Sequence, residues 1–149
     1  MERVFSRGTA SVLAALALTL FIACGGDDGP TSGDPRNTGG ISGTVTFTGT
    51  WPVSGDVQVA VYSSLPPAGP PDAYTNPLNP GTDYPTYDYV ITGLDPGTYD
   101  GIIVSWRDPS DPLSSRVIGQ YSGGMPVVIT KQQTATGFDL SADLSLAGP

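Results

Sequence analysis

The residues that could carry chemistry in this chain are few, because its 149 residues include no histidine and a single cysteine, Cys24. Zinc sites built from cysteine and histidine are excluded, since such a site takes several of these ligands. Nucleophilic arrangements of the Ser-His-Asp and Cys-His kinds are excluded because their general base is missing. We therefore expect a protein that is not an enzyme and that holds no cofactor.

Carboxylates remain as candidate ligands. Asp108 and Asp111 lie three residues apart in a proline-rich stretch and could share a Ca²⁺ ion with backbone carbonyl groups. The stretch lacks the spacing of an EF-hand loop. The alternative, which we prefer, is that each aspartate starts a proline turn. No pair of aspartates has the spacing or context of the acid and base of a glycosidase.

Aromatic residues form the third group of candidates. Trp51, Trp106, Tyr74 and Tyr84 could make a surface on which a sugar or a peptide stacks, because large aromatic rings contribute much contact area. The alternative is that these rings anchor loops and sheet edges by packing. Trp51 precedes a proline in the turn between the first two predicted strands, which places it near one end of the fold.

The N-terminus has the features of a secretory signal. Arg3 and Arg7 precede an apolar stretch over residues 9–22, and Cys24 follows. A basic head, a short apolar segment and a small residue before the cleavage point are typical of a signal peptide. The stretch is too short to span a bilayer, which takes about 20 apolar residues. We predict a signal peptide over residues 1–23.

The cleavage region Phe21-Ile22-Ala23-Cys24 resembles the lipobox of bacterial lipoproteins, with phenylalanine where the family usually has leucine. The resemblance implies that the Cys24 thiol receives a diacylglyceryl group and that acyl chains such as palmitate anchor the mature protein. Each buried methylene contributes about 0.8 kcal/mol, so several chains hold a protein stably. The alternative is an ordinary signal peptide with an incidental cysteine.

In enteric-type sorting of lipoproteins an aspartate after the cysteine retains the protein at the inner membrane, so Gly25 favours the outer membrane. After residue 23 the chain carries thirteen aspartates against four basic residues, a net charge of −9. This charge repels nucleic-acid phosphates and anionic lipids. The expected location is the cell envelope. The expected partners are the membrane, through the lipid, and an unidentified protein or glycan, but not nucleic acid.

The remaining chain divides by composition. Residues 24–40 contain almost only glycine and small polar residues after Cys24, which predicts a disordered, lipidated tether. Sixteen flexible residues reach about 20–24 Å. Residues 41–146 form the predicted domain, and residues 147–149 form a tail.

Alternation of apolar and polar residues predicts the strands of this domain. Seven strands are expected, near residues 41–48, 57–62, 87–91, 97–106, 116–121, 126–130 and 136–144. We therefore expect an all-β fold, a seven-stranded antiparallel β-sandwich. The strand over residues 97–106 is apolar on both faces and should be central. The predicted core consists of Val45, Phe47, Val57, Val59, Val61, Tyr89, Ile91, Leu94, Tyr99, Ile103, Val127, Ile129, Phe138 and Leu140.

Residues 64–86 interrupt this pattern with seven prolines and no strand signal. Loops of this length are uncommon in compact domains unless they are functional or disordered. Tyr74, Leu78 and Tyr84 could pin the segment onto the sandwich or face a ligand.

Four segments together resemble carboxypeptidase regulatory-like domains, also described as transthyretin-like or CnaB-like prealbumin folds. They are residues 41–45 (ISGTV), 89–99 (YVITGLDPGTY), 127–134 (VVITKQQT) and 138–140 (FDL). The resemblance implies a prealbumin-like or immunoglobulin-like sandwich that serves as a stalk, adhesion or accessory module. Some CnaB-like domains close a Lys–Asn crosslink, but the only lysine, Lys131, lies in a late turn, so we expect none.

The central motif of this resemblance has a physical account. Leu94 should fill the bottom of the core, and Asp95-Pro96-Gly97 should make a tight turn, with proline in second place or glycine at positive φ. Tyr99 should bury its ring where the chain re-enters the sheet.

Overall fold

A computed structural model describes residues 37–111 and 114–148 of the chain. The predicted signal peptide, Cys24 and most of the predicted tether lie outside these described residues. Contacts divide the chain after Pro30, and all described residues belong to the second unit. The first strand begins at Gly39, so the last two residues assigned to the tether are part of the domain.

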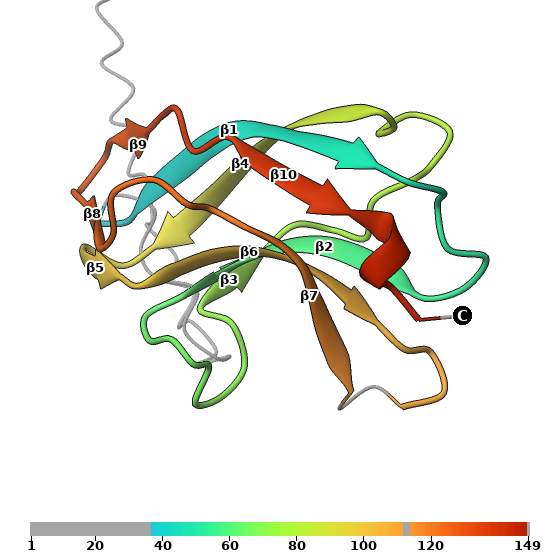
Figure 1. Cartoon of the computed structure of the whole chain (residues 1–149). Coiled ribbons are helices and arrows are strands. Elements are labelled where there is room, and N and C mark those ends of the chain that lie inside the picture. Colours follow the sequence, from blue (N-terminus) through green and yellow to red (C-terminus); the bar gives the residue numbers. More distant parts are fainter. Residues whose placement is uncertain (1–36, 112–113, 149) are drawn as a thin grey trace, which may run out of the picture. The chain divides into compact units, whose positions relative to one another are not determined.

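The described residues form an all-β domain, as the alternating pattern predicted (Figure 1). They contain a single short 3₁₀ helix, η1, after the last strand. The elements are β1 (Gly39–Thr48), β2 (Asp56–Tyr62), β3 (Ala73–Tyr74), β4 (Thr86–Leu94), β5 (Gly97–Tyr99), β6 (Gly101–Arg107), β7 (Ser115–Gln120), β8 (Val127–Ile129), β9 (Thr134–Ala135), β10 (Leu140–Asp143) and η1 (Leu144–Leu146).

The main sheet has the order β3-β2-β6-β7-β10-β1-β4, with β9 also pairing β1, while β5 and β8 form a small second sheet. The main sheet curls into two layers, with β1, β4 and β10 above and β2, β3 and β6 below (Figure 1). β7 connects the layers, because it pairs with β6 along its length and with β10 at Gly119.

The predicted seven-stranded antiparallel sandwich is therefore wrong in its details. β1 runs parallel to both β10 and β9, so the sheet is mixed, and it is continuous between the two layers. Alternation along a strand reports which side chains face the core, and it carries no information about the direction of the neighbouring strand.

Close backbone approach makes the parallel pairing possible. The segment before β10 runs beside β1 and comes so close at Gly43 that a Cβ atom there would collide with the backbone of Phe138. Across this contact the Phe138 N–H donates to the Ser42 carbonyl oxygen (3.2 Å). The Tyr89 hydroxyl donates to the Phe138 carbonyl oxygen (2.7 Å). Glycine is required here because no other residue leaves room for the second chain.

The core predicted from the alternation is confirmed at most positions. Phe138 is only partly buried, and packs edge-on against Tyr121 at 5.3 Å between ring centroids. On β6 the main core is lined by Ile102, Val104 and Trp106. Ile103 is also buried, but it does not belong to that core cluster. The side chain of Leu65, in the segment after β2, lies against Gly101 at the start of β6. β6 is thus covered on both faces, as expected for a central strand.

The central motif packs as its physical account predicted. Leu94 and Tyr99 are buried, and the Tyr99 hydroxyl donates to the Asp95 carbonyl oxygen (2.9 Å), which closes the turn. The positive φ belongs to Gly93 (82°) and not to Gly97. Gly93 lies within β4, where the register against β1 shifts between Gly39 and Gly40, so it is the extra residue of a β-bulge.

Much of the proline-rich segment is an edge of the sheet and not a free loop. Its residues 72–78 follow β2, since the N–H groups of Asp72, Thr75 and Leu78 donate to backbone carbonyl groups of β2 at 2.8–2.9 Å. Leu78 is buried and pins the segment, as one of the two alternatives proposed. No strand signal marks these residues, because proline interrupts regular pairing.

We predict that Gly43→Ala lowers the free energy of unfolding by about 2–3 kcal/mol, because the new methyl group must push the Phe138 backbone away. Urea unfolding followed by circular dichroism measures this change. Gly97→Ala is the matched control, since a Cβ atom there meets no neighbour within 4 Å. Equal stability of the two variants would contradict the close approach of the two backbones at Gly43.

Burial raises the pKa of the Tyr89 phenol well above its ordinary value, and Asp139 raises it further. The folded state therefore keeps the proton where the unfolded chain loses it, and the stability that this adds falls as pH rises above about 10. We predict that Tyr89→Phe unfolds with a shallower loss of stability between neutral and alkaline pH than the unmodified chain. Parallel pH profiles of the two proteins would contradict this assignment.

Candidate functional site

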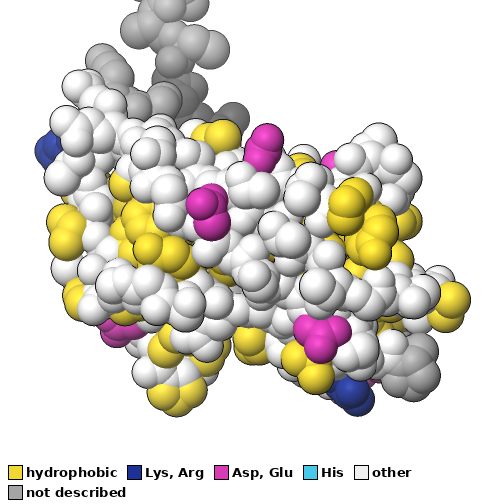
Figure 2. All heavy atoms as spheres, turned by 45° about the horizontal axis from the view of Figure 1, so that its top comes forward, with side chains coloured by type: hydrophobic (Ala, Val, Ile, Leu, Met, Phe, Trp, Pro, Cys, Tyr) yellow, Lys and Arg dark blue, Asp and Glu magenta, His cyan; other side chains and the backbone are white. Residues whose placement is uncertain are grey.

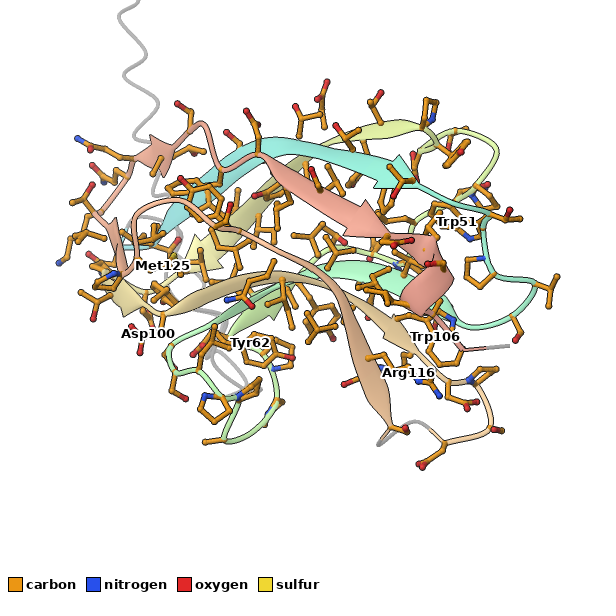
Figure 3. The ribbon with its side chains drawn as sticks, viewed as in Figure 1. Trp51, Tyr62, Asp100, Trp106, Arg116 and Met125 are labelled. Carbon is orange, nitrogen blue, oxygen red and sulfur yellow. The ribbon has the colours of Figure 1, made fainter. Side chains whose placement is uncertain are left out.

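Trp106 is part of the hydrophobic core and is 2% exposed. Its indole Nε1–H donates to the Ser54 carbonyl oxygen (2.9 Å), and the Arg116 guanidinium lies 5.9 Å from the ring centroid. Figure 3 shows Trp106 and Arg116 together on the lower layer. This burial corrects the expectation that Trp106 offers a stacking surface for a ligand. The alternative interpretation, that the Trp106 ring anchors the fold by packing, agrees with its burial and its hydrogen bond.

Trp51 and Tyr84 come together at the end of the domain where β1 finishes and β2 begins. Trp51 is half-buried and packs edge-on against Phe47, with 5.3 Å between ring centroids. Tyr84 is 44% exposed and meets Trp51 at 6.5 Å with an interplanar angle of 87°. We call Phe47, Trp51 and Tyr84, with the neighbouring Val53, the aromatic end. Figure 2 shows hydrophobic side chains gathered at the corresponding right-hand end of the molecule.

The loop that carries Trp51 is held at both of its ends. Gly49 and Gly55 adopt positive φ of 85° and 87°, which lets the chain turn sharply out of β1 and back into β2. The Tyr84 hydroxyl donates to the Gly49 carbonyl oxygen (3.2 Å) at one end. The Trp106 indole holds Ser54 at the other. Residues 50–53 are therefore presented on a fixed backbone, which lowers the entropy cost of binding.

Val53 was not among the residues singled out from the sequence, and it is the most exposed large hydrophobic side chain of the described residues, at 97%. A signal for it was present, because Gly49 and Gly55 bracket Trp51-Pro52-Val53 at the turn between two strands. Apolar residues between two turn glycines indicate a loop that displays them, since no strand face is available to bury them there.

Tyr74 does not join the aromatic end. It lies on β3, is 58% exposed and pairs with Ala60 of β2. Ala60 is four residues along β2 from Asp56, where the loop of the aromatic end finishes, and four residues of strand span about 13 Å. The four aromatic residues proposed as one surface thus occupy three environments: a core position, an edge strand and the aromatic end.

The turn after β6 uses Asp108 as an internal acceptor. Its Oδ1 accepts from the Ser110 backbone N–H (2.7 Å) and from the Ser110 hydroxyl (2.6 Å). These two hydrogen bonds hold the pKa of the exposed Asp108 carboxyl below its usual value. The Asp111 carbonyl oxygen accepts from the Ser114 N–H (2.9 Å). Within residues 37–111 and 114–148 no three acidic, cysteine or histidine side chains are grouped to hold a metal ion.

No protein-family model matches the chain, and no curated protein with which it was compared matches it either. Among the described residues, no helix has the length and apolar character needed to cross a bilayer. The aromatic end therefore stands as the candidate functional site on its geometry alone.

Proposed function

We propose that the protein is a lipid-anchored, non-enzymatic interaction or structural module of the cell envelope, whose aromatic end contacts a partner outside the cytoplasmic membrane. The observation that carries the proposal is the fixed presentation of the exposed Val53 and Tyr84 beside the partly buried Trp51. Rigid aromatic side chains beside exposed apolar ones are typical of the energetic centres of binding surfaces.

The position of the aromatic end supports display away from an anchor. The chain enters the described domain at Asn37, immediately before β1. β1 is ten residues long and spans about 33 Å. The aromatic end follows directly after its far end at Thr48. An acyl group on Cys24 would therefore be joined to one end of β1 while the candidate site lies at the other. Gly25 favours the outer membrane.

The buried Leu94 and Tyr99 and the closed turn between them support the resemblance to carboxypeptidase regulatory-like domains. We propose membership of this prealbumin-like class on that motif. Its members act as stalks, adhesion modules or accessory units, which agrees with a role in contact rather than in catalysis.

We predict that Cys24→Ser moves the protein from the membrane pellet to the soluble fraction, because the acyl acceptor is lost. Fractionation of producing bacteria, with labelled palmitate as a second readout, measures the change. Thr19→Ser, a conservative change in the same apolar stretch, is the control and should leave the protein acylated in the pellet. Membrane retention of unacylated Cys24→Ser protein would refute the anchor.

A second candidate function is carbohydrate binding, favoured by the exposed ring of Tyr84 beside Trp51. We predict that a bound polysaccharide would change the tryptophan emission, since Trp51 is only partly buried whereas Trp106 is fully buried. Tyr84→Ala should then weaken binding about fivefold or more. Tyr74→Ala, at a more exposed tyrosine away from the aromatic end, should not. Unchanged emission across a polysaccharide panel removes this candidate.

A further inference from the structure

The loop between β2 and β3 displays proline rings at the surface of the domain. Its residues 66–70 (PPAGP) are all exposed, and three of them are prolines. A Cβ atom at Gly69 would meet nothing within 4 Å, so open space lies beside the middle of this loop. We call residues 66–70 the proline tip. The tip bears no charge, although the chain as a whole is acidic.

The base of the proline tip is held at the end of β2. The Asp72 carboxylate accepts from the Ser63 N–H (2.6 Å), and the Asp72 N–H donates to the Val61 carbonyl oxygen (2.9 Å). The side chain of Leu65 lies against Gly101, where β6 begins. Proline side chains have almost no rotamer freedom to lose on binding. The tip is therefore an apolar projection on a fixed base, and docking it costs little side-chain entropy.

The proline tip and the aromatic end lie at opposite ends of β2. The loop of the aromatic end leads into β2 at Asp56, and the loop of the proline tip follows β2 after Tyr62 (Figure 1). This strand has seven residues and spans about 20 Å. Residues 72–78 then return along β2, and the chain reaches Tyr84 at the aromatic end. The two surfaces of one copy therefore do not meet.

The aromatic end has the chemistry that binds proline rings. Trp51 and Tyr84 meet edge to face with an interplanar angle of 87°, so two ring planes stand almost at right angles. Tyr84 and the neighbouring Val53 are exposed. Surfaces lined by aromatic side chains are a recurring binding site for proline-rich segments. A proline ring that lies between the two planes contacts both of them and buries apolar surface.

We propose that the proline tip of one copy of this chain docks on the aromatic end of another copy. This inference rests on the proposed function and gives its contact site an occupant. The two surfaces are different, so the contact is heterologous, and a pair of copies still has one free tip and one free aromatic end. Such a contact continues beyond the dimer into a row of copies, or closes into a ring.

Three features favour a second copy as the occupant. Both surfaces are present on every copy and stand on fixed backbones, so their contact orders no further segment. An acidic chain repels its own copies, and the contact limits this repulsion because residues 63–71 include no charged side chain. Under the proposed function, copies anchored through Cys24 share one membrane surface, which keeps their local concentration high.

Disulfide cross-linking of the full chain in producing bacteria tests this contact. With Ala68→Cys at the proline tip and Val53→Cys at the aromatic end, the thiol oxidant diamide should give a ladder of dimers, trimers and larger species on a non-reducing gel. Bacteria that produce the two single variants together should give mixed dimers and nothing larger, because each copy then has one reactive surface. Ala68→Cys with Val90→Cys, at an exposed valine in the middle of β4, is the matched control and should give no ladder. The chain without added cysteines reports any cross-link through Cys24.

Tyr84→Ala in the double-cysteine chain should lower the cross-linked fraction about fivefold or more, because one of the two rings is lost. Val90→Ala should leave this fraction unchanged, and circular dichroism confirms that both variants are folded. Absence of a ladder, an equal ladder from the Val90→Cys control, or a ladder that Tyr84→Ala leaves intact overturns the inference. Fractionation of Cys24→Ser tests the anchor separately, and the cross-link is scored in whichever fraction holds the protein, so failure of one is distinguished from failure of the other.

Discussion

The close approach of two backbones at Gly43 is the constraint on which the rest of the structure depends. Neighbouring strands lie about 4.8 Å apart in the hydrogen-bonding direction, and their side chains fill the space above and below the sheet. At Gly43 the segment before β10 passes closer than a Cβ atom allows. Gly119 plays the same part where β7 meets β10. These two contacts let the C-terminal strand enter the sheet beside β1 and connect the upper layer to the lower.

The consequences extend to the core and to both edges. With β10 beside β1, the Phe138 carbonyl group reaches the Tyr89 hydroxyl, which is otherwise a buried donor without a partner. β4 is left as the outer strand of its layer. The proline-rich segment pairs along β2, and its strand β3 also contacts β4. The two end strands of the curled sheet therefore lie near each other.

The aromatic end shows how core packing and an exposed surface are combined. The Trp106 ring packs in the core, and its indole N–H donates to the Ser54 carbonyl oxygen in the loop. Phe47 is buried and supports Trp51, which in turn positions Tyr84. Because each ring is fixed by the one beneath it, the exposed Val53 sits on a support that is continuous with the core.

Prediction from the sequence succeeded where the signal was local. The alternation around Val45, Val59 and Ile129 identified strands and their buried faces, and the core contains all three. It succeeded again at Leu94 and Tyr99, where the turn and both buried side chains lie within six residues. It could not decide between the two alternatives for Trp106, because the type of an aromatic residue does not say whether a distant segment covers it.

The sequence by itself determined that the domain is all-β, which face of its longer strands is buried, and that its 149 residues offer no histidine. Only the tertiary structure decided that β10 runs parallel to β1, that Trp51 meets Tyr84 while Tyr74 lies elsewhere, and that β3 contacts β4. The reason is the distance along the chain over which each property is set. Side-chain alternation repeats every two residues, whereas strand direction and exposure depend on which segments, far apart in the chain, come into contact.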